Sequence, residues 1–88
     1  GTFYLLNGDY IESEGYYLKA LDILNTMSYQ KGISAIYSNL GTLKVRMREL
    51  KEAKDYYLKS IIINDQIGNV QGNLNSYINL GITAGQEI

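Results

Sequence analysis

Apolar side chains recur at helical spacing along most of the chain. From residue 10 onward, steps of three and four residues build a first apolar stripe, formed by Ile11, Tyr17, Leu18, Leu21 and Leu24. A second stripe follows the same rule and is formed by Ile33, Ile36, Tyr37, Leu40, Leu43 and Met47. No window shows sustained alternation of apolar and polar residues, so we expect no strands. The pattern predicts helix to about residue 7, and then over about 9–27, 30–47, 50–67 and 70–85.

Short polar or glycine-containing segments separate these helices. The first is Asn7-Gly8-Asp9, where Asp9 is the expected N-cap and Glu12 lies at the capping-box spacing. Residues 28–30 and the pair Gly68-Asn69 mark the next breaks. We therefore expect paired antiparallel helices joined by short turns.

The sequence repeats itself when residue 1 is aligned with residue 41. Tyr16-Tyr17-Leu18-Lys19 recurs as Tyr56-Tyr57-Leu58-Lys59, and Leu40-Gly41 recurs as Leu80-Gly81. The repeat divides one domain fragment, residues 1–88, into a partial unit (1–29), a full unit (30–69) and a second partial unit (70–88). A helical pair of this kind cannot bury both faces alone, so its units must stack.

Two residue types recur at positions that predict packing between helices. Glycine in a helix interior costs about 1 kcal/mol relative to alanine, so Gly41 and its repeat partner Gly81 predict the close approach of a neighbouring helix. The repeated tyrosines predict interhelical core positions, and they are Tyr17, Tyr37, Tyr57 and Tyr77.

Composition excludes much chemistry. The chain has no Cys and no His, and its formal net charge is −1. We therefore expect no enzyme, no metal site and no cofactor, and no nucleic-acid or membrane partner. Without a signal peptide or long apolar run, we expect a cytoplasmic protein. One basic run predicts a solvated turn with charge pairs, and it comprises Lys44, Arg46, Arg48, Lys51 and Lys54.

The repeat resembles the tetratricopeptide repeat in the joint spacing of its signature residues. In the full unit these are Tyr37, Leu40-Gly41, Leu50, Ala53, Tyr57 and Ser60. The resemblance implies an all-α fold of antiparallel helix-turn-helix units stacked as a right-handed α-solenoid, with about two units in this chain. The 40-residue period and the absence of Pro indicate a long variety of the repeat, and Arg48 replaces the usual turn glycine.

The same resemblance implies a non-catalytic scaffold that binds a peptide or protein segment in a concave groove. The groove residues carried over from the family are Ser38, Asn39, Thr42, Arg46, Asn75, Ile78, Asn79 and Ile82. Asn39 and Asn79 are the candidates for holding a peptide backbone, because a carboxamide offers both a donor and an acceptor. Ser38, Thr42 and Ile78 stand at the lysine positions of the carboxylate-clamp subtype, so we do not expect that subtype.

An alternative is a sensor or regulatory segment of a larger bacterial signalling or transcriptional regulator that acts through assembly. The chain begins without Met, and its last predicted helix presents an apolar face formed by Tyr77, Ile78, Leu80 and Ile82. We therefore expect either that flanking repeats of a longer protein are missing or that this chain forms homo-oligomers through its terminal helices.

Overall fold

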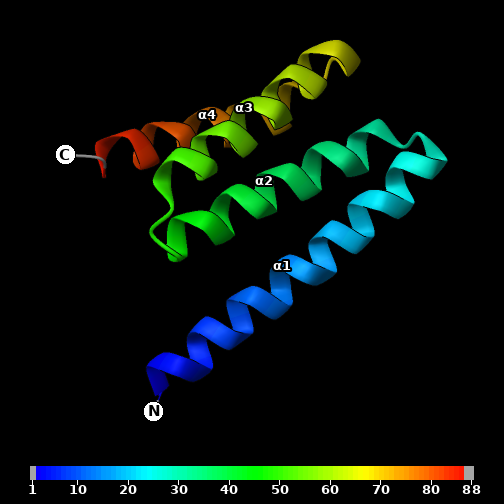
Figure 1. The fold of residues 1–88 in the computed structure, drawn as a ribbon. Coiled ribbons are helices and arrows are strands. Elements are labelled where there is room, and N and C mark those ends of the chain that lie inside the picture. Colours follow the sequence, from blue (N-terminus) through cyan, green and yellow to red (C-terminus); the bar gives the residue numbers. More distant parts are fainter. Residues whose placement is uncertain (1, 87–88) are drawn as a thin grey trace.

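Four antiparallel helices make up the described part of the chain. The computed structural model describes residues 2–86, with side chains from residue 9 onward, and contains no strand in that range. The helices are α1 (Thr2–Met27), α2 (Gln30–Arg46), α3 (Leu50–Ile67) and α4 (Val70–Gly85). Each helix packs against the next, and α4 also reaches α2 (Figure 1). The all-helical repeat architecture expected from the sequence, with about two tetratricopeptide-like units, is confirmed.

All three turns share one backbone geometry. Each contains a single residue with positive φ, namely Ser28 (57°), Arg48 (65°) or Gly68 (72°). The next residue donates its backbone N–H to the carbonyl of a residue in the last turn of the helix, as Glu49 does to Lys44 at 2.9 Å. This bond is the mark of a Schellman motif, which satisfies a carbonyl at the helix end. The three turns are evenly spaced along the chain, so the same junction joins helices within and between units.

The prediction of a turn at residues 7–9 was wrong. Helix α1 runs unbroken from Thr2 to Met27, so Asp9 lies inside it and does not cap it. A glycine in a helix interior costs only about 1 kcal/mol, and no Pro is present to force a break. The turn-forming residues at positions 7–9 are therefore not sufficient to interrupt the helix.

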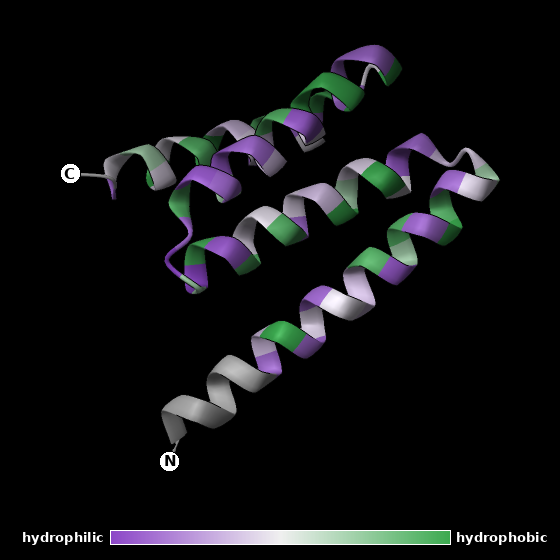
Figure 2. Ribbon diagram, in the orientation of Figure 1, coloured by the Kyte–Doolittle hydropathy of each residue, from purple (hydrophilic) through white to green (hydrophobic). Residues whose placement is uncertain are grey.

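The hydrophobic core lies mainly between α2 and α3. Its buried apolar side chains are Ile33, Leu40, Leu43, Ala53, Tyr57 and Ile61. Figure 2 shows that apolar and polar residues are interleaved along the helices, as expected when each helix buries only part of its circumference. The second predicted stripe is confirmed, because its members are buried or half-buried.

Several predicted core positions lie instead on the surface. Tyr57 is 2% exposed, but its repeat-related residue Tyr77 is 55% exposed. Tyr17 and Tyr37 are half-buried, while Ile11 and Leu18 of the first stripe are exposed. The physical reason is positional: α1 and α4 are the first and last helices of the stack, so each packs less extensively against its neighbours than α2 and α3 do.

The two repeated glycines differ in the same way. A Cβ built on Gly41 would lie 2.7 Å from the Tyr57 ring, so the predicted close helix approach is confirmed there. A Cβ on Gly81 would meet nothing within 4 Å. The close approach predicted for Gly81 is therefore not made by any described residue of this chain.

Candidate functional site: the groove between α2 and α4

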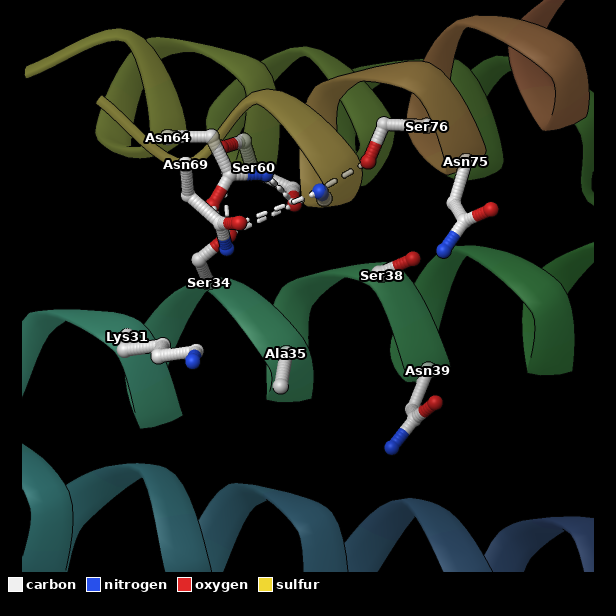
Figure 3. A pocket seen from close by; sticks show the side chains of 11 residues that line it. Lys31, Ser34, Ala35, Ser38, Asn39, Ser60, Asn64, Asn69, Asn75 and Ser76 are labelled. Carbon is white, nitrogen blue, oxygen red and sulfur yellow. Dashed lines mark hydrogen bonds between the residues drawn. The ribbon is translucent and has the colours of Figure 1, made fainter. Parts of the chain in front are cut away.

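A groove of about 220 Å³ lies between α2 and α4, over α3. We call it the α2–α4 groove (Figure 3). Its lining is contributed by α2 (Lys31, Ser34, Ala35, Ser38, Asn39), α3 (Ser60, Asn64) and the α4 segment (Asn69, Gly72, Asn75, Ser76). Serine and asparagine dominate, and none of these residues is acidic, so the groove presents uncharged donors and acceptors and one cation.

The floor of this groove is a buried hydrogen-bond network. The hydroxyl of Ser34 donates to Asn64 Oδ1 at 2.6 Å and lies 2.9 Å from the hydroxyl of Ser60. Ser60 Oγ lies 3.2 Å from Ser76 Oγ. All four side chains are almost completely buried. Because they come from α2, α3 and α4, the network fixes the three helices relative to one another.

Asn69 connects the network to the start of α4. Its amide nitrogen donates to Asn64 Oδ1 at 3.2 Å, while its own side-chain oxygen accepts from the backbone N–H of Gly72 at 3.2 Å. This second bond is a helix N-cap. A Cβ on Gly72 would lie 2.6 Å from Asn69 Nδ2, so glycine leaves the room that these two asparagines occupy.

The rim of the groove carries side chains that are exposed. Lys31, Asn39 and Asn75 are exposed, and within the described part of the chain neither carboxamide makes a side-chain hydrogen bond. Ser38 and Asn75 lie across the groove from each other on α2 and α4 (Figure 3). The groove therefore combines a fixed floor with rim amides that are available to a ligand.

A second groove, of about 310 Å³, lies between α1 and α2. We call it the α1–α2 groove, and it is lined by Tyr10, Ser13, Tyr17, Asn39, Thr42, Leu43 and Arg46. Asn39 lines both grooves, so the two form neighbouring sections of one surface. The Thr42 hydroxyl is already engaged, since it lies 2.9 Å from the hydroxyl of Tyr57. Burial raises the pKa of Tyr57, which keeps that hydroxyl neutral.

The residues predicted for the groove fall into three groups. Ser38, Asn39 and Asn75 line the α2–α4 groove, and Thr42 and Arg46 join Asn39 in the α1–α2 groove. The other three line neither groove: Asn79 is half-buried, and Ile78 and Ile82 are exposed on α4. Asn79 repeats Asn39 one unit later, so its place corresponds to the section of surface beyond α4.

Lys44 was wrongly assigned to a solvated turn. Its side chain is only 7% exposed, and its ammonium lies 2.7 Å from Glu14, 2.9 Å from Glu49 and 3.2 Å from Glu52. The expected charge pairing is thus present, but around a buried cation that links α1, α2 and α3. A cation withdrawn from water is costly without counter-charges, so Lys44 needs these carboxylates.

The three carboxylates keep the Lys44 ammonium protonated. Burial acts to lower the pKa of Lys44, but the hydrogen bonds that its ammonium donates to Glu14, Glu49 and Glu52 outweigh burial and raise the pKa above its usual value. In turn, the hydrogen bond from Lys44 lowers the pKa of Glu49. Lys44 is therefore a charged structural link at neutral pH.

The buried polar network was missed by sequence reasoning, although the repeat carries a signal for it. When the repeats are aligned at the 40-residue period, Asn64 corresponds to Leu24 and Ser76 corresponds to Ile36. Ser34 likewise corresponds to Leu74. Polar residues that replace apolar ones at repeat positions facing the core indicate a buried network, because each must find a partner.

A comparison with known families decides what kind of repeat this is. The sequence profile described as "Tetratricopeptide repeat" matches residues 1–61. The chain belongs to the tetratricopeptide repeat family. Tetratricopeptide repeats mediate protein–protein interaction and are typically non-catalytic. The chain matches no curated protein and no solved structure.

Two further findings concern the described part of this tetratricopeptide repeat chain. No cluster of three or more potential metal ligands occurs among residues described by the structure. Over the same part of the chain, no helix has the length and apolar character needed to cross a membrane.

Proposed function

We propose that this chain is a non-catalytic interaction module that holds an extended peptide segment of a partner protein in the α2–α4 groove. The observation that carries the proposal is the presence of two exposed carboxamides beside a floor whose polar groups are already satisfied. Asn75 points from α4 toward α2, and Asn39 points from α2 toward α1, where it also lines the α1–α2 groove (Figure 3). The family's general role in protein–protein interaction supports it.

The chemistry of the groove suits a peptide backbone. Each peptide unit presents one N–H and one C=O, and a carboxamide can bond to both. The floor atoms are bonded to one another, so they hold α2 and α4 in place and do not compete for the ligand. Such a preorganised site loses little conformational entropy on binding.

The charges at the two grooves restrict the kind of peptide segment that we expect to bind. Lys31 is the cation of the α2–α4 groove, and Arg46 is the cation of the α1–α2 groove. Neither groove has an acidic lining residue. A segment that crosses both sections at Asn39 would therefore be neutral or acidic, and an acidic side chain near either end would be favoured.

A displayed library of random ten-residue peptides tests the proposal. Peptides selected on the wild-type chain are synthesised with a fluorophore, and their affinities are measured by anisotropy. Neutral hydrogen bonds contribute about 0.5–1.5 kcal/mol each, so Asn39→Ala/Asn75→Ala is expected to weaken binding by roughly tenfold. The selected peptides should be neutral or acidic.

Asn79→Ala is the matched control. It removes the same carboxamide from the repeat-related position, but Asn79 lines neither groove. Its affinity is expected to equal that of the wild type. Equal binding by the double variant and the wild type, with the helical circular dichroism of both unchanged, would refute the groove proposal.

A second candidate function is a regulatory segment that acts through assembly. The observation that favours it is the exposed apolar face of the last helix, on which Leu74, Tyr77 and Ile78 are all exposed. An apolar surface of this kind is typical of an interaction face.

A further inference from the structure

Helix α4 exposes the face that its repeat-related helix α2 buries. Tyr37 of α2 stacks on Tyr56 of α3 with ring centroids 6.0 Å apart, and Gly41 lies under the ring of Tyr57. At the same places on α4, Tyr77 is 55% exposed, and Gly81 has open space within 4 Å. Helix α4 thus has the residues that α2 uses to bind a neighbouring helix, but none of the described residues covers them.

The contacts of α2 show what that covering helix must carry. It needs one tyrosine to stack on Tyr77 and a second, next in sequence, to lie on Gly81. It also needs a lysine on the next turn of the helix, because the Lys59 ammonium lies 5.6 Å from the ring centre of Tyr37 and 5.4 Å from that of Tyr56. These requirements define the motif Tyr-Tyr-x-Lys on one helix.

Helix α1 carries this motif. Its residues Tyr16-Tyr17-Leu18-Lys19 are identical to Tyr56-Tyr57-Leu58-Lys59 of α3. In α3 the first tyrosine is half-buried against α2, whereas Tyr16 is 65% exposed. Among the described residues, α1 and α4 therefore each have one uncovered face, and the face on α1 carries the tyrosines and the lysine that the face on α4 requires.

We propose that α4 binds α1 of a second copy of this chain, in the register in which α2 binds α3. Tyr16 of the second copy stacks on Tyr77, Tyr17 lies on Gly81, and Lys19 lies over the tyrosine rings. This inference does not depend on the groove binding a peptide. The two chains together then complete one further tetratricopeptide repeat across their junction.

The unbroken course of α1 allows this contact. If the second copy had a turn at residues 7–9, its residues 1–6 would fold back into the place that α4 of the first copy occupies. The reason is that residue 1 is repeat-related to residue 41 and residue 41 to residue 81. Helix α1 instead continues straight through these positions. Its first two turns therefore extend past the junction and do not compete with α4.

The contact joins two different surfaces, so it does not close on itself. A head-to-tail contact of this kind leaves one free α4 face and one free α1 face on every assembly and generates an open series of species. We expect the weight-average mass to rise progressively with concentration from the monomer value of 9.9 kDa, without a plateau at the dimer.

Two variants, each blocking one face, test the proposal in sedimentation equilibrium. Gly81→Leu fills the space meant for the ring of Tyr17, and Tyr16→Asp places a charge opposite Tyr77. Both positions are open in the single chain, so each variant should retain its helical circular dichroism. Each is expected to weaken self-association at least tenfold.

Mixing the two variants supplies the decisive measurement. Gly81→Leu keeps a free α1 face and Tyr16→Asp keeps a free α4 face, so the equimolar mixture should form a one-to-one heterodimer and nothing larger. Gly15→Leu is the matched control, because Gly15 also has nothing within 4 Å and its repeat-related residue Asp55 is exposed. This control should associate as the wild type does.

Three results would overturn the proposal. The first is a wild-type mass that stays at that of the monomer up to millimolar concentration, which would show that no second copy covers the α4 face. The second is self-association of both blocked variants at wild-type strength. The third is a mixture of the variants that shows no heterodimer although the wild type associates.

Discussion

The ring of Tyr57 lies directly on the backbone of Gly41, where a Cβ would come within 2.7 Å of the ring atom Cε1. This contact brings α2 and α3 together at the centre of the stack. Tyr57 also lies within hydrogen-bond distance of Thr42, the next residue along α2. A single aromatic side chain thus requires a glycine at one position and benefits from a hydroxyl at the next.

The glycine pair gives a prediction with opposite signs at two identical residues. Gly41→Ala forces the buried Tyr57 ring away from α2 and should lower the free energy of unfolding by about 1–3 kcal/mol. Gly81→Ala adds a methyl group in open space and should raise it by up to about 1 kcal/mol through helix propensity. Urea unfolding at micromolar concentration measures both, and a loss of stability at both positions would contradict the assignment.

The second prediction concerns Lys44. Replacing it by Met leaves Glu14, Glu49 and Glu52 close together without their cation. Removing one partner from a fully buried pair costs about 3–5 kcal/mol, but these carboxylates are partly exposed and solvent screens them. We therefore expect Lys44→Met to cost about 1–2 kcal/mol at pH 7. Lys51→Met removes an exposed cation from the same basic run and is expected to cost less, because solvent already screens that charge.

The dependence of this effect on pH follows from Glu49. Its pKa is lowered in the folded chain, chiefly by the hydrogen bond from Lys44. The folded state then favours the ionised carboxylate, so its stabilisation is present above the unfolded pKa of about 4.5 and is lost as the pH falls through the lower folded value. The difference in unfolding free energy between wild type and Lys44→Met should shrink below about pH 4.5. A difference that grows on acidification would contradict this role.

The third prediction separates the members of the buried network. Asn64→Leu restores the residue type found at the repeat-related position 24, but it leaves the hydroxyl of Ser34 and the amide of Asn69 without their acceptor. Unsatisfied buried groups cost about 1–3 kcal/mol. Adding Ser34→Ala removes one orphaned group and should recover part of that loss. A double-mutant cycle measures the coupling, and additive losses would argue against the Ser34–Asn64 bond.

The fourth prediction concerns the turn between α2 and α3. Arg48 adopts φ of 65°, a conformation that costs a residue with a Cβ roughly 1–2 kcal/mol and glycine almost nothing. Arg48→Gly should therefore stabilise the fold by about 1 kcal/mol or less, because glycine also gains entropy in the unfolded chain. Arg48→Ala keeps the Cβ and removes the charge, and it should leave stability nearly unchanged. Equal melting temperatures for the glycine and alanine variants would contradict the backbone explanation.

The sequence determined the fold where periodicity and repetition agreed. The bounds of α2, α3 and α4 were predicted closely because each of these helices combines an apolar stripe with a recurrent turn. The prediction of a break at Gly8 failed because a turn in a repeat protein is set by the packing of the helices on both sides. The prediction that Tyr77 is buried failed for a related reason, since a repeat position specifies a contact only when the neighbouring helix is present.

The candidate site was predicted less completely. Ser38, Asn39 and Asn75 came from their positions in the repeat, and the structure places them in the α2–α4 groove. Lys44 and Asn64 could not be placed by composition or helical period, because both are polar residues whose burial depends on partners from other helices. Only comparison of the two copies, position by position, contains a trace of the network.

The turns at Ser28, Arg48 and Gly68 share one backbone geometry, so the smallest unit by which an end of the stack can grow or shrink is a single helix with its turn, half of one repeat unit. Chains cut and rejoined at any of these junctions would keep the same local backbone. The architecture can therefore lengthen or shorten by single helices, and a change of one helix exchanges which kind of face, the α1 kind or the α4 kind, stands at an end.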